Sequence, residues 1–201
     1  MRFSFLTRKK RARIPIEEQL ANLETVGITL KGNLEIKELL DFDIRDYEER
    51  PYIHLLMSMG RERESLECTD DLYPSNDVWC FDRECIEGHG DYIEALNRIA
   101  AMIEPTISVS DIQDYVDIGA GEAWIAFKAN DASYRYPLPV QDDWMSLEIL
   151  TIFSELLAAS GSSKRFFFVD TGNEVLVVLI NRDQFLSLNK LMNIFIPSTR
   201  A

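Results

Sequence analysis

The residues of this chain that could hold a metal are three cysteines and one histidine, Cys68, Cys80, Cys85 and His89. Zinc is bound by four nitrogen or sulfur ligands in a tetrahedron, usually supplied as close pairs across a tight turn. Here the intervening stretches are eleven, four and three residues long, and no Cys-x-x-Cys pair occurs. Cys80 also lies between two aromatic residues in a strand-like sequence, where a small buried thiol is a normal occupant. The spacing favours structural, reduced cysteines, and we predict no metal or other cofactor.

Hydrolytic chemistry would depend on one of two histidines. Any Ser-His-Asp triad or Cys-His dyad needs an imidazole base, and the only histidines of the chain are His54 and His89. His54 lies in an apolar run, as a core histidine does, and His89 lies between two glycines, which hold a base poorly in fixed geometry. Carboxylate chemistry, with or without a divalent metal, stays open as an alternative, because four acids fall within ten residues: Asp82, Glu84, Glu87 and Asp91.

The sequence disfavours phosphate and nucleic acid ligands. Gly119-Ala-Gly121 lacks both the lysine of a P-loop and the third glycine of a dinucleotide-binding motif, and it is typical of a turn between strands. Beyond the N-terminus there is no basic patch with interleaved aromatic residues, which nucleic acid binding requires. We therefore expect the body of the protein to bind no nucleic acid.

Charge is divided sharply along the chain. Residues 1–16 contain six bases and no acid, whereas residues 17–201 contain the other 15 bases and all 34 acids, a net charge of −19. We expect residues 1–14 to form a flexible basic arm, because unanchored termini seldom pack. Residues 15–201 should form one α+β domain, either whole or with residues 15–60 as a small N-terminal lobe. So acidic a body should repel phosphates and attract a protein partner with a basic surface.

Acidic clusters are the candidate partner-binding residues. Five acids fall within nine residues, and two more form a pair further along: Asp41, Asp43, Asp46, Glu48, Glu49, Asp70 and Asp71. A solvated, solubilising surface is the simplest interpretation of any one cluster, while several clusters of one sign can also steer a basic partner. We expect the first five acids to be exposed and weakly paired.

The elements that must position these residues follow from hydrophobic periodicity and turn residues. We predict helices near residues 16–26, 34–40, 91–103 and 144–161, with Asp142 or Asp143 capping the last, and a further helix opened by Asn181 and Gln184. Strands are predicted over residues 52–59 and 78–82, and hairpins over 123–136 and 165–180. The order favours an α+β fold, mainly antiparallel sheet built from hairpins and packed with about four to five helices.

A resemblance to a known class rests on three stretches: Val78-Trp-Cys-Phe-Asp-Arg-Glu-Cys-Ile-Glu87, Gly90-Asp-Tyr92, and Asp142-Asp-Trp144 ahead of a helix. Over residues 78–195 the chain resembles the immunity proteins of bacterial polymorphic and contact-dependent toxin systems. Those are small acidic α+β proteins that neutralise toxin domains. Such families share little sequence, so the resemblance assigns no binding residue, and the basic arm is not part of it.

These observations predict a non-enzymatic cytosolic binding protein, most concretely an immunity protein that occludes the basic surface of a toxin. No run approaches the roughly 18 apolar residues of a membrane span, and the N-terminus lacks the apolar core of a secretory signal. A carboxylate-dependent enzyme and a structural or regulatory interaction module are the alternatives. The second would need an exposed apolar patch rather than an acidic one.

Overall fold

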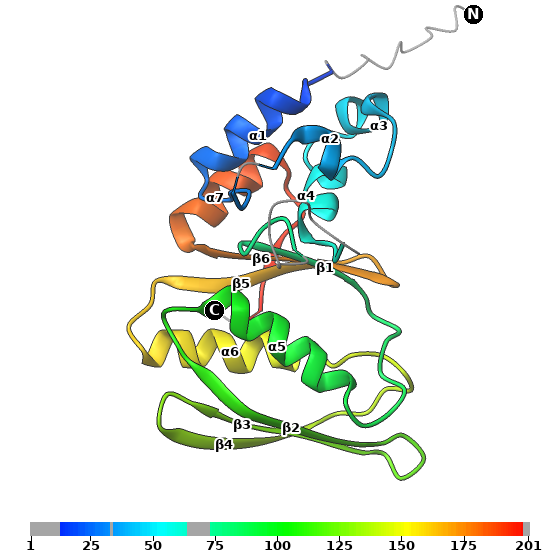
Figure 1. The fold of residues 1–201 in the computed structure, drawn as a ribbon, viewed down its shortest axis with the longest axis vertical. Coiled ribbons are helices and arrows are strands. Elements are labelled where there is room, and N and C mark those ends of the chain that lie inside the picture. The colour runs from blue at the N-terminus through cyan, green and yellow to red at the C-terminus, as the bar shows by residue number, and fades with distance from the viewer. Residues whose placement is uncertain (1–12, 33, 64–72, 199–201) are drawn as a thin grey trace, which may run out of the picture.

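The computed structural model describes residues 13–32, 34–63 and 73–198. It contains seven helices in that part of the chain: α1 (Ile16–Thr25), α2 (Ile36–Leu39), α3 (Ile44–Glu49), α4 (Ile53–Gly60), α5 (Asp91–Ile103), α6 (Glu148–Ala159) and α7 (Arg182–Leu191). The strands are β1 (Val78–Asp82), β2 (Val109–Asp117), β3 (Glu122–Ala129), β4 (Ala132–Leu138), β5 (Lys164–Asp170), β6 (Glu174–Asn181) and β7 (Ile196–Pro197). The helices and strands together form four layers, which run from top to bottom in Figure 1: helices, sheet, helices, sheet.

A four-stranded antiparallel sheet in the order β1-β6-β5-β7 lies at the centre. Its strand β6 carries six consecutive buried residues, Val175–Ile180. Because both faces of β6 are covered, neither set of alternating side chains faces water, and residues 175–180 are therefore all apolar. The hairpin predicted over residues 165–180 is confirmed as β5 and β6.

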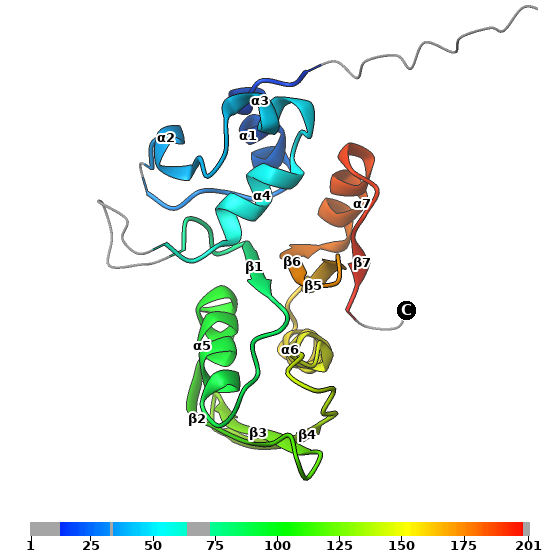
Figure 2. The same ribbon diagram turned by 90° about the vertical axis from the view of Figure 1, so that its right-hand side faces the viewer.

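The lower half of the molecule consists of helices α5 and α6 and the three-stranded sheet β2-β3-β4 (Figures 1 and 2). The two helices lie between the sheets, and side chains from both helices and both sheets form one apolar cluster, in which Ile99, Ile125, Phe153 and Val177 are buried. The predicted turn at residues 119–121 and the hairpin β3–β4 are confirmed. Strand β2 was not predicted from the sequence.

The upper layer contains α1 to α4 and α7, which cover the opposite face of the central sheet (Figure 1). Here the structure corrects one prediction, because residues 52–59 are helical rather than a strand. Helix α4 buries Leu55, Leu56 and Met59 against the sheet. Their spacing is that of one helical face, whereas a strand would bury alternate residues. A short apolar run does not by itself distinguish the two.

The start of α6 is a second correction. The helix begins at Glu148, not near Trp144, and neither Asp142 nor Asp143 caps it. Trp144 instead pairs in isolated β-bridges with Glu84 and with Gln141. Residues 141–144 form a turn with φ 55 at Asp142, and backbone hydrogen bonds from Ile86 to Asp143 and from Met145 to Arg83 hold this turn against the segment after β1. Nevertheless, the α+β class, two mainly antiparallel sheets and five helices of eight residues or more among the described residues agree with the prediction.

Candidate partner-binding surface

The cysteines and the histidine that were considered as metal ligands are dispersed, as far as the structure describes them. Cys80 is buried in β1, and burial raises the pKa of its thiol to about 11. Cys85 is half-buried after β1, and the imidazole Nδ1 of His89 accepts a hydrogen bond from the Val116 backbone at 2.9 Å. Cys68 lies outside the described residues. Within the described ranges, no three His, Cys, Asp or Glu side chains converge to hold a metal ion.

His54 lies against an aromatic wall rather than in a catalytic constellation. Its ring centroid is 5.2 Å from that of Phe42 and 6.1 Å from that of Tyr47. Burial lowers the pKa of His54, and the Arg50 guanidinium lowers it further, against the opposing effect of Asp46. The neutral imidazole is therefore the favoured form at neutral pH.

The predicted acidic cluster divides into structural and exposed members. Asp41 accepts a hydrogen bond from Ser58 Oγ at 2.9 Å and forms an ion pair with Arg63. Glu49 pairs with Arg13 on the surface. In contrast, Asp43 and Asp46 are exposed and form no ion pair within the described part of the chain. The expectation of weak pairing is therefore wrong for Asp41.

The remaining predicted residues add little to this surface. Glu48 is half-buried, and its backbone carbonyl accepts a hydrogen bond from Ile14 at 3.5 Å. Asp70 and Asp71 lie outside the described residues. A partner-binding role for these seven acids stays a prediction.

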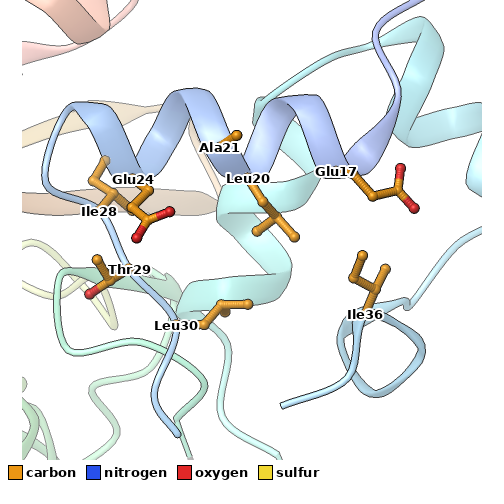
Figure 3. Close-up of a pocket in the computed structure, with 8 residues that line it drawn as sticks. All are labelled: Glu17, Leu20, Ala21, Glu24, Ile28, Thr29, Leu30 and Ile36. Atoms are coloured by element: carbon orange, nitrogen blue, oxygen red, sulfur yellow. The ribbon is translucent and has the colours of Figure 1, made fainter. Parts of the chain in front are cut away.

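A different acidic surface is present on α1. A groove of about 410 Å³ lies between α1, the segment after it and α2 (Figure 3). Leu20 and Ala21 of α1 form one side, with Leu30 and Ile36 facing them. Leu20, Leu30 and Ile36 also pack against the buried apolar residues between the upper helices and the central sheet, so part of each side chain is held in the core.

The local sequence explains why the groove forms. Helix α1 buries Ile16, Gln19 and Leu23 on one face, which leaves the neighbouring face to line the groove with Glu17, Leu20, Ala21 and Glu24. Gly27 then ends the helix with φ +77, and a Cβ at this position would meet the Gln184 side chain at 2.0 Å. The backbone of Ile28 donates a hydrogen bond to the Leu23 carbonyl at 3.0 Å, which turns the chain back beneath the helix. A glycine is required at such a turn.

The second wall is fixed by a distant residue. The backbone and hydroxyl of Thr29 both donate hydrogen bonds to Asp77 Oδ2, at 3.1 and 2.9 Å. Lys164 Nζ lies 3.3 Å from Asp77 Oδ1 and balances its charge. The groove is therefore a preformed feature of the fold.

Two glutamates give the groove its electrostatic character. Glu17 and Glu24 lie at opposite ends of it in Figure 3, with Leu20 between them. Both are exposed, and neither forms an ion pair with any residue in the described ranges. Seven residues on a helix span about 10 Å, so the groove presents two carboxylates about that far apart across an apolar floor.

The sequence contained a signal for this site that the acidic clusters obscured. Glu17, Leu20, Ala21 and Glu24 follow the i, i+3, i+4, i+7 spacing of one helix face. The wall opposite them could not be read from this spacing.

Comparison with protein-family models, with curated proteins and with solved structures found no match. No helix in the described part is both long and apolar enough to cross a membrane.

Proposed function

We propose that this chain is a non-enzymatic binding protein of the immunity type, which neutralises a protein partner by covering a basic surface. The observation that carries the proposal is the groove on α1, whose floor is apolar and whose two ends carry Glu17 and Glu24, which form no ion pair with any described residue. The net charge of −19 over residues 17–201 supports it, because a field of one sign steers a basic partner toward the protein.

The groove determines what kind of segment would fit. An apolar floor stabilises apolar side chains of the partner by removing them from water. Carboxylates about 10 Å apart favour two lysine or arginine side chains separated by two helical turns. The proposed occupant is accordingly an amphipathic segment of the partner, apolar at its centre and basic at both ends.

A rescue experiment tests this proposal. The full chain is co-expressed with a toxin encoded beside its gene, and growth and complex formation are measured. The wild-type chain should protect, and Glu17→Gln/Glu24→Gln should weaken binding at least tenfold. Glu122→Gln/Glu155→Gln removes the same charge from exposed positions on β3 and α6 and should bind as the wild type does.

Two results would overturn the proposal. One is a wild-type chain that neither binds nor protects against that toxin. The other is a groove variant that binds as tightly as the control variant. Because the chain's own first residues are basic and apolar, a peptide of residues 1–12 is also added to the full chain. Groove-dependent binding of this peptide, without toxin binding, would assign the groove to the arm instead.

A further inference from the structure

A second cavity lies on the other side of the central sheet and has a different lining. It encloses about 240 Å³ between β1, the segment that follows β1 and the first half of α5. Trp79 and Phe81 contribute to its wall from alternate positions of β1, which place their side chains on one face. This face is opposite to the one covered by α1 to α4.

The wall of this cavity is aromatic. The Trp79 and Phe81 rings are stacked with centroids 4.0 Å apart. Tyr73 also lines the cavity, and the Arg98 guanidinium lies over its ring, 3.8 Å from the centroid. Aromatic faces carry negative potential and attract cations. The contact between Arg98 and Tyr73 is an example within the same lining.

Carboxylates surround the aromatic wall. Glu62, Asp82, Asp91 and Glu94 all line the cavity, against the single guanidinium of Arg98 among the described lining residues. Asp91 Oδ2 accepts backbone hydrogen bonds from Glu87 and Gly88, at 2.7 and 2.8 Å, which fix its orientation. A carboxylate has about four acceptor positions, so capacity remains for a ligand.

Two other groups in the lining respond to this negative field. Burial first, and the neighbouring carboxylates second, raise the pKa of the Cys85 thiol to about 11. Burial and the Glu62 carboxylate raise the pKa of Tyr73 to about 12. Both groups are thus held neutral, and the cavity disfavours a further negative charge.

We propose that this cavity binds one alkylguanidinium or alkylammonium group, held between the aromatic wall and the carboxylates Asp82, Asp91 and Glu94. Its volume is smaller than the roughly 300–1,000 Å³ of sites for drug-sized ligands, which suits a single extended side chain or a small amine. The site is separate from the groove on α1 and does not depend on the function proposed for that groove.

The experiment uses a matched pair of probes and the full chain. N-acetyl-arginine amide is titrated and followed by backbone amide chemical shifts, and N-acetyl-citrulline amide, its neutral isostere, is titrated in parallel. The arginine probe should saturate with shifts centred on β1 and the start of α5. The citrulline probe should bind at least tenfold more weakly, and the arginine affinity should fall as salt rises, since exposed charges are screened.

Variants test the lining directly. Asp82→Asn/Glu94→Gln should weaken binding of the arginine probe at least fivefold. Asp131→Asn/Glu155→Gln makes the same chemical change at exposed positions outside the lining and should leave binding unchanged. Urea unfolding of both variants checks that the fold is retained. Equal binding of the two probes, or an arginine affinity unaffected by the first variant, would overturn the proposal.

The source of the cation is resolved by a third probe. n-Butylguanidine carries the same single positive charge on a bare alkyl chain, without the peptide groups. If the natural ligand is a protein side chain, the blocked arginine should bind at least as tightly as n-butylguanidine. If the natural ligand is a free small cation, n-butylguanidine should bind more tightly. Either result supports the site, and failure of both probes to bind refutes it.

Discussion

Asp41 should be a structural residue, although it belongs to a sequence cluster that looks like a solvated surface. Its carboxylate accepts hydrogen bonds from Ser58 Oγ at 2.9 Å and from Arg63 Nη2 at 3.1 Å. The Tyr47 hydroxyl contacts Ser58 Oγ at 2.8 Å and accepts a hydrogen bond from the Asp41 backbone at 2.8 Å. Tyr47 and Ser58 are fully buried, and the Asp41 side chain is 23% exposed.

The effect of removing this carboxylate follows from what it leaves behind. In Asp41→Ala, Arg63 would lose its carboxylate partner with only 17% of its side chain exposed. Hydrogen bonds to charged groups contribute roughly 1.5–3 kcal/mol, and a buried polar group left without a partner carries a similar cost. Arg63 keeps its bonds to the Leu39 and Ser58 carbonyls, at 2.9 and 3.1 Å, which limits the loss. We expect a loss of about 2–3 kcal/mol in unfolding free energy.

Urea and thermal unfolding measure this loss against a neighbouring acid. A chain of this length should lose about 2–4 °C of melting temperature per kcal/mol, so Asp41→Ala should melt about 4–12 °C lower. Asp46→Ala, an exposed change in α3, should stay within about 0.5 kcal/mol of the wild type. If Asp41→Ala and Asp46→Ala unfold at the same urea concentration, the network does not stabilise the fold and this reasoning is wrong.

Three other substitutions test separate parts of the structure. Gly60→Ala should lower the unfolding free energy measured in urea by about 1–3 kcal/mol, because its Cβ would lie 2.8 Å from a backbone nitrogen of β1. Gly88→Ala is the control, because a Cβ there meets open space and should lower the unfolding free energy far less. The folded-state pKa of His54 is below its ordinary 6.5, so the unfolded chain takes up the proton more readily and the unfolding free energy should fall from pH 7.5 to 5. The His54→Gln variant should lose less unfolding free energy over that interval. Parallel pH profiles for the variant and the wild type would contradict this. Asp82→Asn should speed alkylation of Cys85 by iodoacetamide at pH 8, because it removes one of the carboxylates that raise the thiol pKa; an unchanged rate would mean that burial alone controls it.

The parts of the fold that were predictable from the sequence are those in which local signals agree. The run from Val175 to Leu179 has turn residues before it and a helix cap after it, and these signals together favour a covered strand. Asn181 and Gln184 form the expected reciprocal cap at 3.0 and 2.9 Å. The apolar run at residues 52–59 had no such second signal. Its helical form depends on packing against β1 and β6, which the sequence around it does not encode.

The candidate sites were less predictable because each joins distant segments. The α1 groove needs Thr29 to bond Asp77, 48 residues further along the chain. The second cavity brings Glu62 and Tyr73 to α5 through tertiary packing. Sequence density of acids pointed to residues 41–49, where Asp41 and Glu49 are already paired with bases. The number of acids in a stretch of sequence does not reveal which of them form ion pairs in the fold.

Pairing separates acids that stabilise this protein from acids that could bind a partner. Arg83 pairs with Asp170 and Arg61 with Glu174, so those carboxylates are largely neutralised within the fold. Glu17 and Glu24 have no such base in the described ranges and flank an apolar floor instead. A partner that supplies two bases there gains two ion pairs without breaking any, and it buries apolar surface at the same time. A partner drawn to a paired acid would have to displace an internal base, which is why we propose the groove, and not those acids, as the contact for a basic partner.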